Sequence, residues 1–184
     1  MSTPTPVRAF TLVETMVAIA IVAISIVGPL YALEKGVIAS YAARDKLAAS
    51  ALAQEGVEYV HAIRDSNYLY NLGSPIVPHS WFYGLDGTGG PNCVNGGVCV
   101  VDAVNNTNTV CSSPSTCPPL RLSSAGVYTQ VSSGSNVASK FTRTVALTSV
   151  GSDGREMKVT VTVSWKTGLV NYSVSVSENL QNWL

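Results

Sequence analysis

The sequence predicts an α+β protein in which a long N-terminal α-helix packs on a C-terminal antiparallel β-sheet. Two patterns predict this fold. An apolar block near the N-terminus runs into a segment whose apolar residues recur at helical spacing, and the last third of the chain alternates apolar with polar residues. The 184 residues suffice for one modest domain with an extension.

Composition restricts the classes of function. Hydrophobic residues make up 46% of the chain and charged residues only 12%, which is about half the usual charged share. The formal net charge is zero, so no strongly basic domain or tail indicates nucleic-acid binding. One weaker cluster of cations lies on the predicted sheet, where we favour a solvated strand surface over DNA capture. Its members are Lys140, Arg143, Arg155, Lys158 and Lys166.

The apolar block is long enough to cross a membrane. No charged residue occurs from Thr15 to Leu33, and a helix of that length covers about 28 Å, close to the ~30 Å hydrocarbon core of a bilayer. The preceding residues Met1–Ala9 carry Arg8 and no acid, and positive flanks tend to stay cytoplasmic. No cleavage site follows the block, so we predict a retained anchor, with the rest of the chain outside the bacterial inner membrane.

A single carboxylate stands at the edge of this block. Glu14 directly follows Phe10-Thr11-Leu12-Val13, and a carboxylate in lipid costs about 2.5–3.5 kcal/mol, less near the interface. Taken alone, Glu14 would be interpreted as snorkelling to the headgroups. The string from Arg8 to Glu14, however, resembles the processing site of type IV prepilins and type II secretion pseudopilins. In that family a short basic leader is cut before Phe or Met, and a Glu stands four residues after the new N-terminus.

The resemblance implies the fate of the N-terminal residues. Residues 1–9 would be a leader that prepilin peptidase removes by cutting between Ala9 and Phe10, and Phe10 would then be N-methylated. Ala9 replaces the Gly that the family normally has before the cut. Phe10 and Glu14 would serve filament assembly, with Glu14 pairing with the terminal amine of a neighbouring pilin or pseudopilin subunit. The protein would first occupy the inner membrane and then a cell-surface or periplasmic filament.

The helix is predicted to continue beyond the membrane. We assign residues 10–35 to a transmembrane and assembly helix, and residues 36–65 to an amphipathic stalk helix. Gly28-Pro29 lies inside the first part, where proline predicts a kink. The stalk places apolar side chains on one face, which should pack on the sheet. These are Leu47, Ala51, Leu52, Val57, Val60 and Ile63.

Residues 66–184 are predicted to form an extracytoplasmic head. Its first part, residues 66–119, is rich in Gly, Pro, Asn and Ser and should be largely irregular, with strand-like segments at Val98–Val104 and Leu120–Ser123. All four cysteines lie in this part, and an even, clustered set suits disulfides in an oxidising compartment. Local pairing is the simplest of three connectivities. The cysteines are Cys93, Cys99, Cys111 and Cys117.

The second part of the head, residues 120–184, should hold the sheet. Phe141–Val150 is strand-like, and Gly151–Gly154 has the composition of a turn. Two strictly alternating segments follow, separated by a tight turn at Thr167-Gly168. Three antiparallel strands result, with one apolar and one polar face. The alternating apolar residues are Met157, Val159, Val161, Val163 and Trp165, and then Val170, Tyr172, Val174 and Val176.

No catalytic, cofactor or metal site is recognisable in the sequence. His61 and His79 are the only two histidines, and neither a Ser-His-acid arrangement nor an HExxH helix occurs. The Gly-rich run at residues 84–90 lacks the lysine of a phosphate loop. Asp86 and Asp102 fit no recognised calcium loop. We therefore predict no enzyme activity and no cofactor.

The resulting prediction is a structural subunit, a minor pilin or pseudopilin of a type IV pilus or a type II secretion filament. The sequence does not choose between these two machines. One alternative is a pilin-like module that binds DNA or a surface through the head. The other is a membrane-tethered enzyme with an uncleaved anchor.

Overall fold

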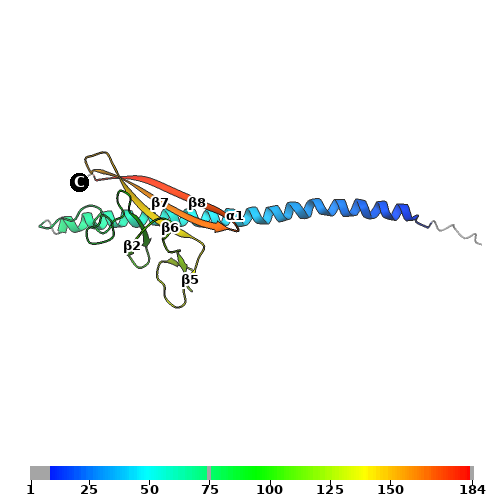
Figure 1. Ribbon diagram of the computed structural model, residues 1–184, viewed down its shortest axis with the longest axis horizontal. Coiled ribbons are helices and arrows are strands. Elements are labelled where there is room, and N and C mark those ends of the chain that lie inside the picture. Colours follow the sequence, from blue (N-terminus) through cyan, green and yellow to red (C-terminus); the bar gives the residue numbers. More distant parts are fainter. Residues whose placement is uncertain (1–8, 74–75, 183–184) are drawn as a thin grey trace, which may run out of the picture. The chain divides into compact units, whose positions relative to one another are not determined.

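Helix α1 extends from Leu12 to Gly73 and contains Pro29 without interruption (Figure 1). The structure, a computed structural model, describes residues 9–73 and 76–182. The chain divides into two units, residues 1–45 and residues 46–184. Most of the predicted leader, including Arg8, and the C-terminal Trp183 lie outside the described residues.

The first unit consists of helix α1 up to residue 45. The helix contains a stretch that is long and apolar enough to cross a membrane, and none of that stretch is buried within the chain. Ser25 donates a hydrogen bond to the carbonyl oxygens of Ile21 and Val22, at 2.9 Å each. A hydroxyl satisfied in this way does not oppose burial in lipid.

In the second unit the helix continues further than predicted. We expected its end at Asp65, but it reaches Gly73. Two asparagines of the additional turns bond to the segment that returns along the helix. Asn67 Nδ2 donates to the carbonyl oxygen of Tyr83 at 3.0 Å, and Asn71 exchanges two hydrogen bonds with the backbone of His79, at 2.7 and 2.9 Å. These tertiary bonds outweigh the weak helix propensity of asparagine.

A five-stranded antiparallel sheet follows, in the order β2-β1-β6-β7-β8. The three predicted strands are confirmed as β6 (Thr142–Val150), β7 (Glu156–Thr167) and β8 (Val170–Gln181). The tight turn between β7 and β8 is Gly168-Leu169, one residue later than predicted. Gly168 has φ of 62°, a conformation that glycine adopts without steric cost.

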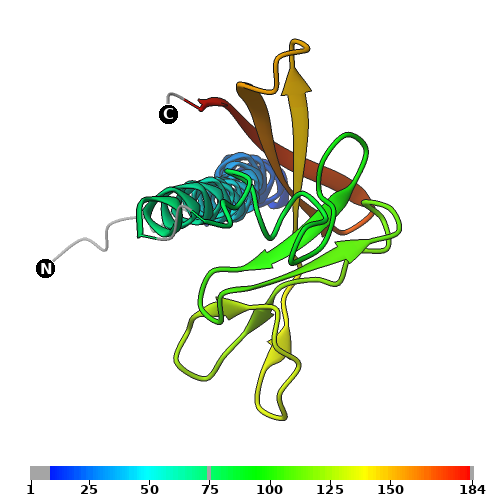
Figure 2. The ribbon, with the colours of Figure 1, turned by 90° about the vertical axis from the view of Figure 1, so that its left-hand side faces the viewer.

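Two further strands extend the sheet. Strand β1 (Val98–Asp102) lies within the predicted segment, whereas β2 (Thr107–Cys111) had no apolar alternation by which to predict it. A separate small sheet has the order β4-β3-β5 (Figure 2). Its strands are β3 (Arg121–Leu122), β4 (Tyr128–Thr129) and β5 (Val137–Ala138).

The core of the head lies between the apolar face of the sheet and helix α1 (Figure 1). The helix approaches the sheet closely at Gly56, where a Cβ atom would lie only 2.8 Å from Val161 Cγ1. Glycine in a helix costs about 1 kcal/mol relative to alanine, and this close approach explains its presence. The predicted packing of the sheet on the stalk, and with it the α+β fold, is confirmed, but Leu47 and Ala51, which we expected on the packed face, are exposed. Fully buried members of this core include Ala53, Val60, Val145, Leu147, Val159, Val161 and Val163.

Candidate functional site

The candidate site begins where helix α1 starts. Ala9 and Phe10 precede the helix, and Thr11 caps it. The Glu14 backbone N–H donates to Thr11 Oγ1 at 3.3 Å, and the Thr15 N–H donates to the Thr11 carbonyl oxygen at 3.2 Å. Thr-x-x-Glu at a helix start is the pattern of a capping box. We had not assigned this role to Thr11, although the three-residue spacing to Glu14 predicts it.

The position of Glu14 suits a negative charge. Glu14 lies in the first turn of α1, where the unpaired N–H groups and the helix dipole stabilise a carboxylate. Its side chain is exposed, and Phe10 is 78% exposed. Both residues are therefore free to contact another molecule, and Glu14 follows Phe10 by four positions.

The residues after Glu14 form an exposed apolar surface around the helix. Large side chains that a soluble protein would bury are here more than half exposed. Each Å² of apolar surface removed from water contributes about 25 cal/mol, so this surface requires lipid or other protein to cover it. It includes Met16, Val17, Ile19, Ile21, Val22, Ile24, Ile26, Val27 and Leu30.

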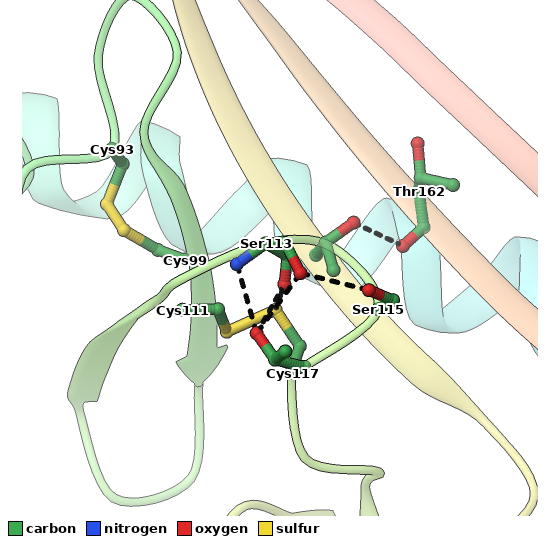
Figure 3. The surroundings of a disulfide bond; sticks show 9 residues. Cys93, Cys99, Cys111, Ser113, Ser115, Cys117 and Thr162 are labelled. Carbon is green, nitrogen blue, oxygen red and sulfur yellow. Dashed lines mark hydrogen bonds between the residues drawn. A yellow bond between two sulfur atoms is a disulfide. The ribbon is translucent and has the colours of Figure 1, made fainter.

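The head contains two disulfides, Cys93–Cys99 and Cys111–Cys117 (Figure 3). This is the local pairing, one of the three that the sequence allowed. Cys99 lies in β1 and Cys111 ends β2, and the register places Cys99 opposite Val110. One bridge therefore ties the segment before β1 to the hairpin, and the other ties the segment after β2 to the same end of it.

Arg143 lies in the core and not on the polar face of the sheet. It shares a face of β6 with Val145 and is 1% exposed. Its Nη1 donates to Glu55 Oε2 at 2.5 Å and to the Leu52 carbonyl oxygen at 3.0 Å. Its Nη2 donates to the Val101 carbonyl oxygen at 2.9 Å. Our interpretation of Arg143 as part of a surface cluster of cations was wrong, because its guanidinium joins the helix to β1 and β6.

The two aspartates considered for calcium are engaged in hydrogen bonds. Asp102 is fully buried and accepts from Thr129 Oγ1 at 2.6 Å and from the Gln130 N–H at 2.8 Å. Burial would raise the pKa of Asp102, but these bonds and those from Asn105 outweigh it and hold the pKa below its usual value. Asp86 accepts from the Thr88 N–H at 2.9 Å. Among the described residues, no group of three or more potential ligands is placed to hold a metal ion.

The two histidines have structural surroundings. His61 Nε2 lies 3.2 Å from Glu178 Oε2, which links α1 to β8. The His79 ring stacks between the rings of Tyr70 and Tyr83, with centroid distances of 3.9 and 3.8 Å. Each imidazole therefore contacts a neighbouring element of the head.

Comparison with known proteins identifies the N-terminal segment. Residues 5–28 match the family model described as the prokaryotic N-terminal methylation motif. No curated protein and no solved structure matches the chain. The matched residues contain the capped helix start, Glu14 and most of the apolar block.

This motif is the type IV prepilin signature, and it is followed here by a long apolar helix and an antiparallel sheet. The signature indicates a type IV pilin-like protein, and the α+β architecture of the chain is pilin-like. Proteins of this class are structural, and the signature implies processing by prepilin peptidase and assembly with other pilins. The apolar helix fits anchoring in the inner membrane before assembly.

Proposed function

We propose that the protein is a minor pilin or pseudopilin, a filament subunit of a type IV pilus or a type II secretion system. The observation that carries the proposal is the apolar surface of α1 behind an exposed Glu14. A permanent membrane anchor would explain the apolar surface, but it would give the acid in its first turn no role beyond capping the helix and reaching the headgroups. A helix that passes from lipid into a bundle of identical helices accounts for both.

The proposed assembly step depends on a charge that proteolysis creates. Cleavage between Ala9 and Phe10 would leave a terminal amine, which is positive at neutral pH. Glu14 of a neighbouring subunit would neutralise this amine among apolar helices, where an unpaired charge is strongly disfavoured. The pair would set the axial register of the subunits, while burial of the apolar surface would supply most of the stabilisation.

Mass spectrometry of the mature N-terminus tests the processing step. In cells with an active prepilin peptidase we expect the chain to begin with N-methylated Phe10. Cells that lack the peptidase serve as the control and should retain residues 1–9. A chain that keeps its leader in the presence of the peptidase, or that is trimmed beyond Leu33 and secreted, would contradict the proposal.

Two substitutions of Glu14 separate charge pairing from helix capping. Glutamine at this position can still complete a capping box, whereas alanine cannot. We expect both Glu14→Gln and Glu14→Ala to insert in the membrane but to enter sheared filaments more than about tenfold less efficiently, because one unpaired member of a buried pair costs about 3–5 kcal/mol. The measured quantity is the ratio of subunit in filaments to subunit in membranes.

Glu34→Gln is the matched control, since Glu34 is an exposed acid on the same helix at the other end of the apolar block. It should leave incorporation unchanged. If Glu14→Gln assembles normally while Glu14→Ala does not, Glu14 acts through the capping box and the charge pair is not used.

A further inference from the structure

A cavity of about 520 Å³ lies in the head where helix α1 ends. Its volume falls within the range of about 300–1,000 Å³ that is usual for small-molecule sites. Three segments surround it: the last turns of α1, the returning segment around Trp81, and the end of β8 with the residue after it. The cavity could not be predicted from the sequence, because its walls bring residues 64–81 together with Gln181 and Asn182.

Hydrogen bonds within the protein hold the walls of the cavity in place, so the cavity is formed before any ligand binds. Asn67 is 7% exposed and donates to the carbonyl oxygens of Trp81 and Tyr83, at 3.3 and 3.0 Å. Asn71 exchanges two hydrogen bonds with the backbone of His79. The segment that carries Trp81 is therefore fastened to the helix that carries Tyr68. A preformed aromatic wall of this kind reduces the entropy cost of binding.

The cavity has no uncompensated charge among its described lining residues. Its only cation is Arg64, whose Nη2 lies 2.8 Å from Asp65 Oδ1 and whose Nε donates to the same oxygen at 2.9 Å. An anionic or cationic ligand would have to compete with this pair. The electrostatics of the cavity therefore favour a neutral ligand.

The polar lining favours a ligand with many hydroxyl groups. The side-chain amides of Gln181 and Asn182 make no hydrogen bond with the described residues, and each amide offers two donors and an acceptor with two lone pairs. A purely apolar ligand would remove these groups from water without replacing their bonds, which is unfavourable. A pyranose ring has an apolar C–H face that packs on an aromatic ring, and hydroxyl groups around its edge. It can therefore contact both the aromatic side chains and the amides of the lining.

We propose that this cavity binds a neutral saccharide, with Trp81 and Tyr68 contacting the faces of the sugar and Gln181 and Asn182 bonding to its hydroxyl groups. The proposal concerns the head alone and does not depend on how Phe10 is processed or assembled. It gives a subunit of this class a means of recognising glycan at a cell or polymer surface.

Binding of defined trisaccharides to the full-length chain tests the proposal. The chain is held in micelles of a zwitterionic detergent without a sugar headgroup, and the probes are maltotriose, cellotriose and triacetylchitotriose. Saturation-transfer NMR with titration measures binding. We expect saturable binding of at least one probe, and affinity reduced by about tenfold or more in Trp81→Ala, as is typical when an aromatic anchor is truncated.

Because Trp81 also packs against the core, a second variant removes the polar contacts instead. Gln181→Ala combined with Asn182→Ala changes residues at the edge of the head, and it should weaken binding without loss of folding. Tyr172→Ala is the matched control, since Tyr172 is a 44% exposed aromatic residue of β8 outside the cavity, and it should bind normally. Absence of saturable binding to all three probes, or equal binding by both cavity variants and the wild type, would overturn the proposal.

Discussion

Replacing Arg143 with alanine is expected to lower the free energy of unfolding of the head by about 2–5 kcal/mol, because it truncates a large, fully buried side chain and leaves two buried carbonyl oxygens without their donors. The substitution removes the donors to Glu55, Leu52 and Val101 and leaves a cavity between α1 and the sheet. Urea unfolding of the full chain in detergent, followed by near-ultraviolet circular dichroism, measures the change.

Two further variants separate the packing of the Arg143 side chain from its hydrogen bonds and provide a control. Arg143→Met keeps the volume of the side-chain stem and should cost less than alanine, because packing is retained while the hydrogen bonds are lost. Lys158→Ala removes an exposed cation from β7 and should change stability by less than about 0.5 kcal/mol. If Arg143→Ala were as stable as Lys158→Ala, the buried guanidinium would contribute nothing to joining the helix to the sheet.

Removing the Cys93–Cys99 disulfide should have the second large effect. Replacing both cysteines with alanine is expected to cost about 3–5 kcal/mol, of which about 2–3 kcal/mol is the entropy of closing a loop this short. The remainder comes from packing, since both sulfur-bearing side chains are fully buried. Thermal unfolding in oxidising buffer, with and without the two substitutions, measures the difference.

The second disulfide is a natural control for the first. Both bridges have a sequence separation of 6, so the loop-closure contribution to each is equal. Cys117 is 7% exposed, but Cys111 is only partly buried and ends the largely exposed strand β2, so Cys111→Ala with Cys117→Ala should cost only about 2–3 kcal/mol. Equal losses for the two double variants would show that burial of the first bridge adds nothing.

The local features of this protein could be predicted because each rests on neighbouring residues. The predicted anchor follows from an uncharged run, and the two faces of β7 follow from alternation. Register in an antiparallel sheet with one buried face is strongly specified by that alternation. The four cysteines indicated disulfides for the same reason, although their spacing left the pairing open.

Other features depended on residues far apart in the sequence. The β2 strand is polar and became recognisable only through its pairing with β1. Arg143 was assigned to the surface by its charge, yet its side chain enters the core because Glu55 and two backbone carbonyls receive it there. A buried cation is stable only when such partners are present, and the partners lie on other elements.

The sequence by itself thus indicated the class of the protein and predicted the processing of its N-terminus, because a processing motif and a membrane span are properties of consecutive residues. The tertiary structure alone decided where helix α1 ends, which cysteines pair, where Arg143 points and that a cavity forms beside Trp81. Each of these depends on contacts between segments that only folding brings together, and their free energies outweigh the local preferences of the residues involved.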